Sequence, residues 1–276
     1  VLAIMGTPIF VIMSLFALVA FAFVGIDSSA VAVEIYRIAS APTLLTIPLF
    51  TLAGYLMAES KSPKRLLDLA EACLGWLPGG VAIVGLVICA FFTAFTGASG
   101  VTIIALGGRL FPILVREGYS EKFSLGLITT SGSLGLLFPP SLPIILYGLV
   151  AKTDIDSLFK AGIVPGFLLI LILSLWSIKN GGLKATRTPL NLKKIRQACW
   201  NSRFELPLPF FVLFGIYGGY TTASEAAAIT AFYVLVMVVW LYKDLSLKKD
   251  VPRIINESMT LVGAILLILC CGLGMT

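Results

Sequence analysis

Glycine and hydroxyl residues interrupt two long apolar stretches of the chain, and they are the residues best suited to binding a ligand. The first interruption has the sequence TGASG at residues 96–100, where Gly97 and Gly100 permit a tight turn. Ser99 and, just after it, Thr102 supply hydroxyl oxygens of the kind that a hard cation takes as ligands. Sodium is the cation that this chemistry suggests.

The second interruption lies within residues 120–152. The break should begin near Ser131, because Ser131-Gly132-Ser133 and Gly135 weaken a helix there. Pro139 and Pro140 remove backbone donors, so carbonyl groups should be freed near these positions. Backbone that leaves a helix at membrane depth is tolerated only where protein buries it or where it lines a cavity. Small residues also permit close helix packing, but two breaks in one region favour a binding site.

Other chemistry finds little support. The chain contains no His, and its five Cys lack the spacing of a metal site. Glu225 could be a functional acid inside the membrane, but Thr222 precedes it by three residues, as in a capping box that begins a helix. Glu205 follows Arg203 and should lie at the membrane interface. We therefore expect neither an enzyme nor a cofactor.

Composition requires a membrane around these breaks. Hydrophobic residues make up 58% of the chain and charged residues 12%, with a mean hydropathy of +1.01. Soluble domains carry about twice that share of charge. The sequence thus predicts an all-α, polytopic integral membrane protein in contact with the lipid bilayer. The net charge of +6 then concerns orientation and does not indicate a nucleic acid partner.

The elements that position the two breaks follow from the apolar runs. A loop is expected at 27–41 and a second surface helix within 179–203. Between them, an amphipathic surface helix should have Ser62 as its N-cap and Pro63 at its first position. The predicted spans cover 9–25, 44–57, 165–178, 206–220 and 224–242, and a last span begins near Asn256.

The first break should be the tip of a hairpin. Its arms, 80–95 and 101–115, each hold about 15 residues, or about 23 Å of helix, whereas a bilayer core is about 30 Å thick. We therefore predict a re-entrant hairpin whose tip stops inside the bilayer. The stretch 120–152 is long enough to cross but should be a discontinuous helix.

Charge asymmetry predicts the orientation. With the N-terminus in the cytoplasm, all of the 20 Lys and Arg residues except Arg37, Lys152 and Lys160 lie on the cytoplasmic side. Lys193 and Lys194 are then cytoplasmic, while Asp154 and Asp156 are periplasmic. Two full spans in place of the hairpin would give the same split.

Several segments resemble the large permease subunit of tripartite ATP-independent periplasmic (TRAP) transporters, the type that carries C4-dicarboxylates or sialic acid. The matching motifs occur in order over nearly the whole chain: APTLLTIPLFTLAGYLM (41–57), TGASGVTIIALG (96–107), REGYSEKFSLGLITTSGSLGLLFPPSLPIILYG (116–148), FKAGIVPG (159–166) and YTTASEAAAITAFYVL (220–235). The glycine-rich tip followed by a Pro-Pro-Ser break is the most specific of these features.

This resemblance implies a sodium-driven importer of organic acid anions in the bacterial inner membrane. A periplasmic substrate-binding protein would deliver the anion, a small membrane (Q) subunit would assist, and transport would follow an elevator mechanism. The sodium-binding residues would be Gly97, Ser99, Gly132, Gly135 and Pro139. The substrate-facing residues would be Ser99, Thr102, Pro139 and Pro140.

The resemblance also implies a division of the chain. Scaffold and interfacial arm helices would occupy 1–78, and a transport region 79–152 would comprise the hairpin 79–115 and the broken helix 120–152. Further spans with the cytoplasmic loop 179–203 would fill 153–254, and a second inverted repeat would begin in 255–276 and continue beyond it, which makes the chain a fragment.

One departure from the family pattern is Ala98, where the tip often has Ser, so one candidate hydroxyl is missing. Three alternatives stay open: a one-component sodium-dicarboxylate carrier, a membrane-embedded enzyme, and a structural subunit whose breaks only pack. Dicarboxylates, sialic acid, keto acids and sulfonates all remain possible substrates.

Overall fold

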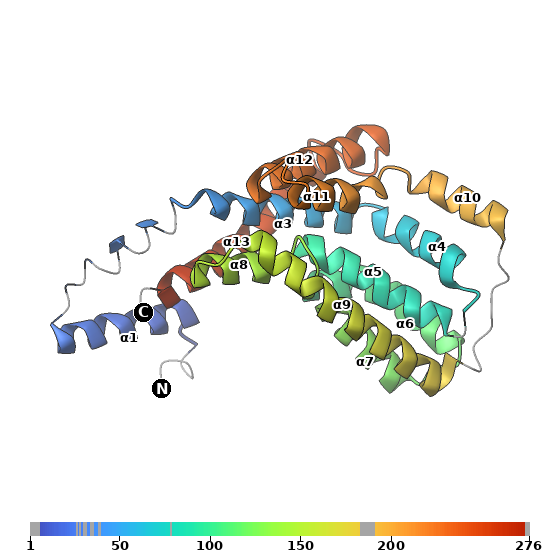
Figure 1. Ribbon diagram of the computed structural model, residues 1–276, viewed down its shortest axis with the longest axis horizontal. Helices are drawn as coiled ribbons and strands as arrows, with labels where there is room; N and C mark the ends of the chain where they lie inside the picture. Colours follow the sequence, from blue (N-terminus) through green and yellow to red (C-terminus); the bar gives the residue numbers. More distant parts are fainter. Residues whose placement is uncertain are drawn as a thin grey trace.

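The protein is an elongated bundle of helices. The computed structural model describes residues 6–25, 40–77, 79–182 and 191–273, with isolated positions between 27 and 37. Figure 1 shows α1 and the end of α13 together at one end of the molecule, and α4 and α10 at the other. Within the described ranges there is no β-strand. The predicted all-α fold is confirmed.

The helices follow the apolar runs of the sequence. They are α1 (Ile9–Val24), η1 (Pro42–Leu45), α3 (Thr46–Glu59), α4 (Ser62–Leu74), α5 (Gly80–Thr96), α6 (Ser99–Arg116), α7 (Glu121–Leu134), η2 (Gly135–Leu137), α8 (Leu142–Ala151), α9 (Ile155–Ser177), η3 (Ile178–Gly182), α10 (Leu192–Asn201), α11 (Pro207–Tyr217), α12 (Ala223–Val236), η4 (Met237–Leu241) and α13 (Asp250–Leu273).

Length and composition identify the helices that could cross a membrane. Four stretches in the described part of the chain qualify: α6, α9 with its η3 extension, α12 with η4, and α13. A fifth is the pair formed by α7–η2 and α8, which is bent by 44° at the break between them. A polytopic membrane protein is thus supported. The hairpin arms are longer than the expected 15 residues, at 17 in α5 and 18 in α6, so arm length does not argue for re-entrance, which stays a prediction.

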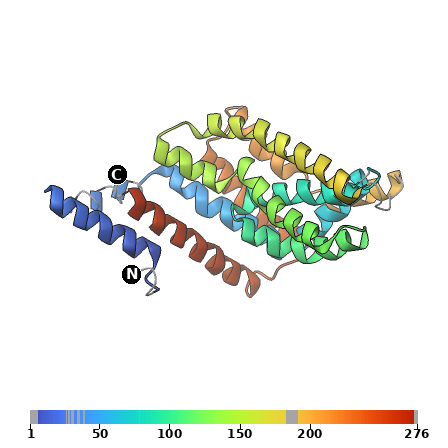
Figure 2. The same cartoon turned by 90° about the horizontal axis from the view of Figure 1, so that it is seen from below.

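Helix α3 holds the bundle together. It packs against α12, α13 and α5, and Figure 2 shows it running through the middle of the molecule. Phe50, Ala53 and Leu56 on α3 are buried in the core. Gly54 lets α3 approach the hairpin tip, because a Cβ at this position would lie 2.5 Å from the Cα atom of Thr96. The central helix is therefore in backbone contact with the first break.

Some element boundaries differ from the prediction. Helix α9 begins at Ile155, ten residues before the predicted span, because the Asp154 carboxylate caps it by accepting a hydrogen bond from the Ser157 amide at 2.9 Å. Helix α13 begins at Asp250 instead of near Asn256. Of the fifteen positions in the loop predicted at 27–41, seven lie outside the described residues, and five of the eight described ones are helical.

The two predicted surface helices exist and pack side by side as α4 and α10 (Figure 1). Asn191 caps α10 by accepting from the amides of Lys193 and Lys194. The prediction that Ser62 caps α4 is wrong. Lys61 occupies the cap position, and the Ser62 hydroxyl instead donates to the Glu205 carboxylate at 3.0 Å.

A buried ionic cluster joins α4 to the rest of the bundle. Arg65 donates to Glu205 Oε1 and to Asp244 Oδ2, each at 2.6 Å, and the guanidinium lies 3.7 Å from the centre of the Tyr242 ring. The Tyr242 hydroxyl donates to Glu205 Oε2 at 2.6 Å. The side chain of Glu205 is 0% exposed and that of Asp244 4%. Glu205, expected at the membrane interface, is therefore enclosed by protein.

Candidate binding site at the hairpin tip and the broken helix

The tip of the hairpin is a tight two-residue turn. Helix α5 ends at Thr96, and Gly97 follows in the left-handed region with φ 65°, its amide donating to the Thr93 carbonyl at 2.8 Å. Ala98 is extended, and α6 starts at Ser99. The interruption predicted at 96–100 is thus confirmed but shorter, because helical structure continues on both sides of residues 97 and 98.

Three buried threonine hydroxyls join the two arms just behind the tip. Thr93 of α5 donates to Thr102 Oγ1 of α6 at 2.8 Å, and Thr96 Oγ1 lies 3.2 Å from the same oxygen. All three residues are fully buried. Thr102 was predicted to face substrate. Its hydroxyl instead bonds to other threonines inside the hairpin, which does not support contact with substrate, and the substrate-facing role of Thr102 stays a prediction.

The second break separates η2 from α8. Phe138 is extended, and the Ser141 hydroxyl donates to the Leu136 carbonyl at 2.6 Å, which satisfies one carbonyl of the interrupted helix. The break was expected to begin near Ser131, and this is wrong because α7 continues through Gly132 to Leu134. In the η2 segment that follows, the Gly135 carbonyl accepts from the Phe138 amide at 3.1 Å.

The two breaks meet. A Cβ on Gly97 would lie 2.5 Å from Cβ of Leu142, the first residue of α8. A Cβ on Gly132 would lie 2.6 Å from Ile103 Cγ1 and 3.3 Å from the Ser99 carbonyl oxygen. Gly135 lies so close to α5 that a Cβ would overlap the carbonyl oxygen of Ala90. Four predicted site residues, Gly97, Ser99, Gly132 and Gly135, thus form one contact region.

In this region, carboxyl ends of helices lie against amino ends of other helices. The carboxyl end of α5 lies against the amino end of α8, and the amino end of α6 lies against the last turn of α7. Carboxyl ends carry about half a negative charge and amino ends about half a positive charge. Residues 96–102 and 132–142 include no Asp, Glu, Lys or Arg. Backbone dipoles therefore dominate the electrostatics of the site.

Pro139 and Pro140 lie within the second break. Pro140 is buried, whereas Pro139 is half-buried and borders an apolar cavity of about 280 Å³ between α5, α9 and α11. This cavity is lined by aromatic and aliphatic side chains, among them Phe91, Phe95 and Phe138. Pro139 is therefore part of the second break and also borders this apolar cavity.

Three residues of the contact region were not predicted from the sequence. Thr93 completes the hydroxyl group of the hairpin, Leu142 faces Gly97, and Ala90 faces Gly135. The spacing of Thr93 and Thr96, three residues apart on one helix face, could have indicated the first. The other two are apolar residues in apolar runs, and only the packing identifies them.

The remaining predicted acid has a structural role. Thr222 and Glu225 form a capping box at the start of α12: the Thr222 hydroxyl accepts from the Glu225 amide, and the Glu225 carboxylate accepts from the Thr222 amide at 2.8 Å. Among the described residues, no group of three or more His, Cys, Asp or Glu side chains could hold a metal ion.

Comparison with known proteins identifies close similarity along the chain. The family model described as the DctM component of the tripartite ATP-independent periplasmic transporter matches residues 1–275. An isethionate TRAP transporter permease protein of Oleidesulfovibrio alaskensis is 40% identical over 206 residues, which are 74% of this chain and 32% of the relative.

Two further relatives show a range of transported compounds in their names. The C4-dicarboxylate TRAP transporter large permease protein of Rhodobacter capsulatus is 34% identical over 246 residues, 82% of this chain and 55% of that protein. The ectoine TRAP transporter large permease protein of Halomonas elongata is 29% identical over 238 residues, 83% and 54% of the two chains. The chain thus spans about half the length of these two permeases.

Proposed function

This chain belongs to the DctM component family of tripartite ATP-independent periplasmic transporters, and on that premise we propose that it forms part of the large membrane subunit of a sodium-coupled importer of organic acid anions. The observation that supports this proposal best is the contact between the hairpin tip and the broken helix. It brings two helix breaks together in a segment rich in apolar residues.

The cation would bind near the carboxyl ends of α5 and α7. Carbonyl groups of a last helical turn have no partner within their helix, and they present negative dipole ends. Gly97 and Gly135 are the C-cap residues of these two helices. Ser99, half-buried beside them, adds a hydroxyl oxygen, and sodium accepts several neutral oxygen ligands. Gly132 would act by letting α7 approach Ser99.

The anion would bind near the amino ends of α6 and α8. Free backbone amides and the positive dipole end favour a carboxylate or sulfonate at such positions. Ser99 at the start of α6 and Pro139-Pro140 just before α8 are the candidate contacts. A backbone site of this kind selects a substrate by its negative charge, and other contacts would select the rest of the molecule by its shape.

Partners follow from the family and from the names of the relatives. A periplasmic substrate-binding protein would deliver the anion, and a small membrane subunit would join the large one in the bacterial inner membrane. Dicarboxylates, sulfonates and sialic acids are the substrate classes that we propose. An elevator movement would carry the hairpin and the broken helix across the bilayer relative to the other helices.

Sodium-dependent uptake by the complete transporter in proteoliposomes tests this function. Ser99→Ala should raise the half-saturating sodium concentration without unfolding the protein, because it removes one oxygen ligand. Ser246→Ala is the matched control, since Ser246 is exposed in the turn before α13 and lies outside both breaks. If the two variants retain the same sodium dependence as the parent, Ser99 is not a sodium ligand.

The same preparation separates the alternatives. Uptake that needs no binding protein would indicate a one-component carrier. A complete complex that shows neither uptake nor a sodium-dependent rise in melting temperature would indicate a structural subunit. Each of these results would contradict the proposal.

A further inference from the structure

Helix α10 carries an unusual excess of positive charge. Residues 179–203 contain seven Lys or Arg residues and no Asp or Glu. Two of the seven, Lys193 and Lys194, stand in the first turn of α10, which has no acidic residue. Positive charge at the amino end of a helix opposes the helix dipole and is unfavourable for the helix itself. These side chains therefore have a use other than stabilising α10.

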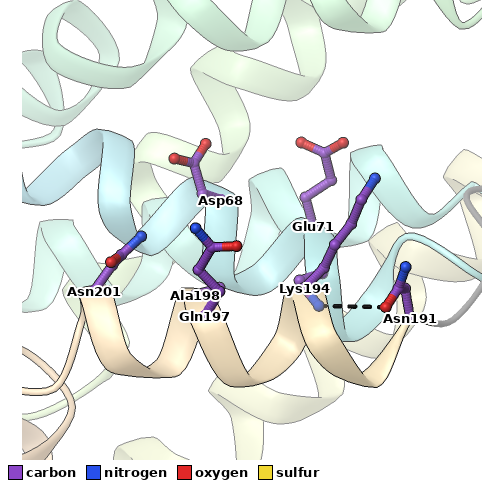
Figure 3. A pocket seen from close by; sticks show the side chains of 8 residues that line it. Asp68, Glu71, Asn191, Lys194, Gln197, Ala198 and Asn201 are labelled. Atoms are coloured by element: carbon purple, nitrogen blue, oxygen red, sulfur yellow. Dashed lines mark hydrogen bonds between the residues drawn. The ribbon is translucent and has the colours of Figure 1, made fainter.

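The charges of α10 divide between two faces. Lys194 borders a polar pocket of about 240 Å³ between α4 and α10, together with Asp68 and Glu71 of α4 (Figure 3). The acidic side chains there offset its charge. Successive helix residues are about 100° apart, so Lys193, Arg196 and Trp200 lie within about 60° of each other on a different face.

No acidic group accompanies this second face. In the part of the chain that the structure describes, Lys193, Arg196 and Arg203 make no ion pair with a carboxylate. Lys193 and Arg196 are exposed. Charge complementarity thus favours an anionic partner outside the chain.

An exposed aromatic residue stands among these cations. The Trp200 side chain is 68% exposed, and the Arg203 guanidinium lies 4.7 Å from its ring centre and 4.6 Å from that of Phe204. Next to the basic face, Leu192 is 78% exposed and Ile195 is half-buried. Trp with Arg or Lys beside exposed apolar residues is the arrangement of a helix that lies at the headgroup level of a bilayer.

We propose that Lys193, Arg196, Trp200 and Arg203 form a binding surface for the headgroups of anionic phospholipids. The three cations hold phosphate oxygens, while Trp200 and the apolar side chains of Leu192 and Ile195 enter the acyl boundary. The surface anchors the α4–α10 pair to one leaflet. The proposal of this surface requires only that the chain resides in a membrane, so its test is independent of sodium coupling.

Native mass spectrometry of the full-length permease, supplied with equal amounts of phosphatidylglycerol and phosphatidylcholine, tests the surface. The parent should retain phosphatidylglycerol preferentially. The double variant Lys193→Gln/Arg196→Gln should retain at least about tenfold less of it, because each basic residue near the lipid surface contributes substantially to anionic lipid binding. Excess inorganic phosphate should not displace the lipid.

The matched control is Lys194→Gln/Lys249→Gln, which removes the same net charge from the polar pocket and from the exposed turn before α13. It should retain phosphatidylglycerol as the parent does. An equal loss in both double variants would show that diffuse charge attracts the lipid, and displacement by inorganic phosphate would show a site for soluble anions. Either result overturns the proposal.

A second measurement does not depend on the folding of these variants. With every other tryptophan of the full-length permease replaced by Phe, including Trp76, Trp176 and Trp240, Trp200 fluorescence should be quenched more strongly by phosphatidylglycerol brominated near the headgroup than by the equivalent phosphatidylcholine. Equal quenching by the two lipids would contradict anionic selectivity, and no quenching by either would place Trp200 away from the bilayer.

Discussion

Gly97 at the tip of the hairpin lies directly against Leu142, the first residue of the second half of the broken helix. A Cβ on Gly97 would lie 2.5 Å from Leu142 Cβ, a separation that two unbonded carbon atoms do not adopt. Gly97 also has φ 65°, in the left-handed region. Two independent requirements for glycine thus coincide where the two breaks meet.

Gly97→Ala should therefore abolish transport by the complete complex. The left-handed conformation costs a residue with a side chain about 1–2 kcal/mol, and the overlap with Leu142 adds a similar packing cost. Gly100→Ala is the control, because nothing lies within 4 Å of a Cβ there. Uptake in proteoliposomes measures the difference. Full activity of the Gly97 variant would mean that transport does not require the close contact between the hairpin tip and Leu142.

Gly135→Ala should separate the second break from α5. Gly135 has φ −64°, which any residue can adopt, so the requirement for glycine is the close approach to Ala90 and Thr93. We expect a loss of sodium-dependent stabilisation in thermal unfolding. Gly126→Ala in α7, where a Cβ meets nothing within 4 Å, should leave that stabilisation unchanged. Gly135→Val should be more severe than Gly135→Ala.

Thr102→Val should loosen the two arms of the hairpin. The substitution keeps the side-chain shape but removes the hydroxyl that Thr93 and Thr96 contact. Leaving a buried hydroxyl unpaired costs about 1–3 kcal/mol. Faster hydrogen exchange at residues 93–102 would check this expectation. Thr129→Val provides a comparison, because Thr129 is exposed and bonds only to its own helix.

Arg65→Met should destabilise the protein strongly. It would leave Glu205 and Asp244 as two buried carboxylates without their guanidinium, and breaking a buried ion pair costs about 3–5 kcal/mol. Arg253→Met is the matched change, since Arg253 pairs with Glu59 and Glu257 but is 49% exposed. Exposed pairs contribute at most about 1 kcal/mol. Similar melting temperatures for the two variants would contradict this account.

Cysteine labelling tests the predicted orientation. A membrane-impermeant thiol reagent added from the periplasm should label a Cys introduced at Asp154, in a variant without the native cysteines. It should not label one introduced at Lys193. The reverse pattern would place the N-terminus in the periplasm, and the charge asymmetry would then need another explanation.

The sequence predicted those features that local chemistry determines. Apolar runs located most of the helices, and glycine and proline located both breaks. It placed the start of the second break too early, because Ser131 and Gly132 stay helical: the Ser131 hydroxyl bonds back to the Ile128 carbonyl, and Gly132 leaves room for Ile103. The burial of Glu205 could not be predicted, since its partners Arg65 and Tyr242 are distant in the sequence and only the tertiary fold brings them together.

The crossed helix ends at the two breaks have a consequence for net charge. Two negative and two positive half-helix ends close together form an arrangement that is neutral as a whole. A sodium ion alone, or an organic monoanion alone, would leave one uncompensated charge in surroundings of low polarity. The empty site and the site holding both ions with equal and opposite charge avoid that electrostatic penalty. Half-loaded states would then be the costly ones to move across a bilayer, which would make sodium and anion cross together.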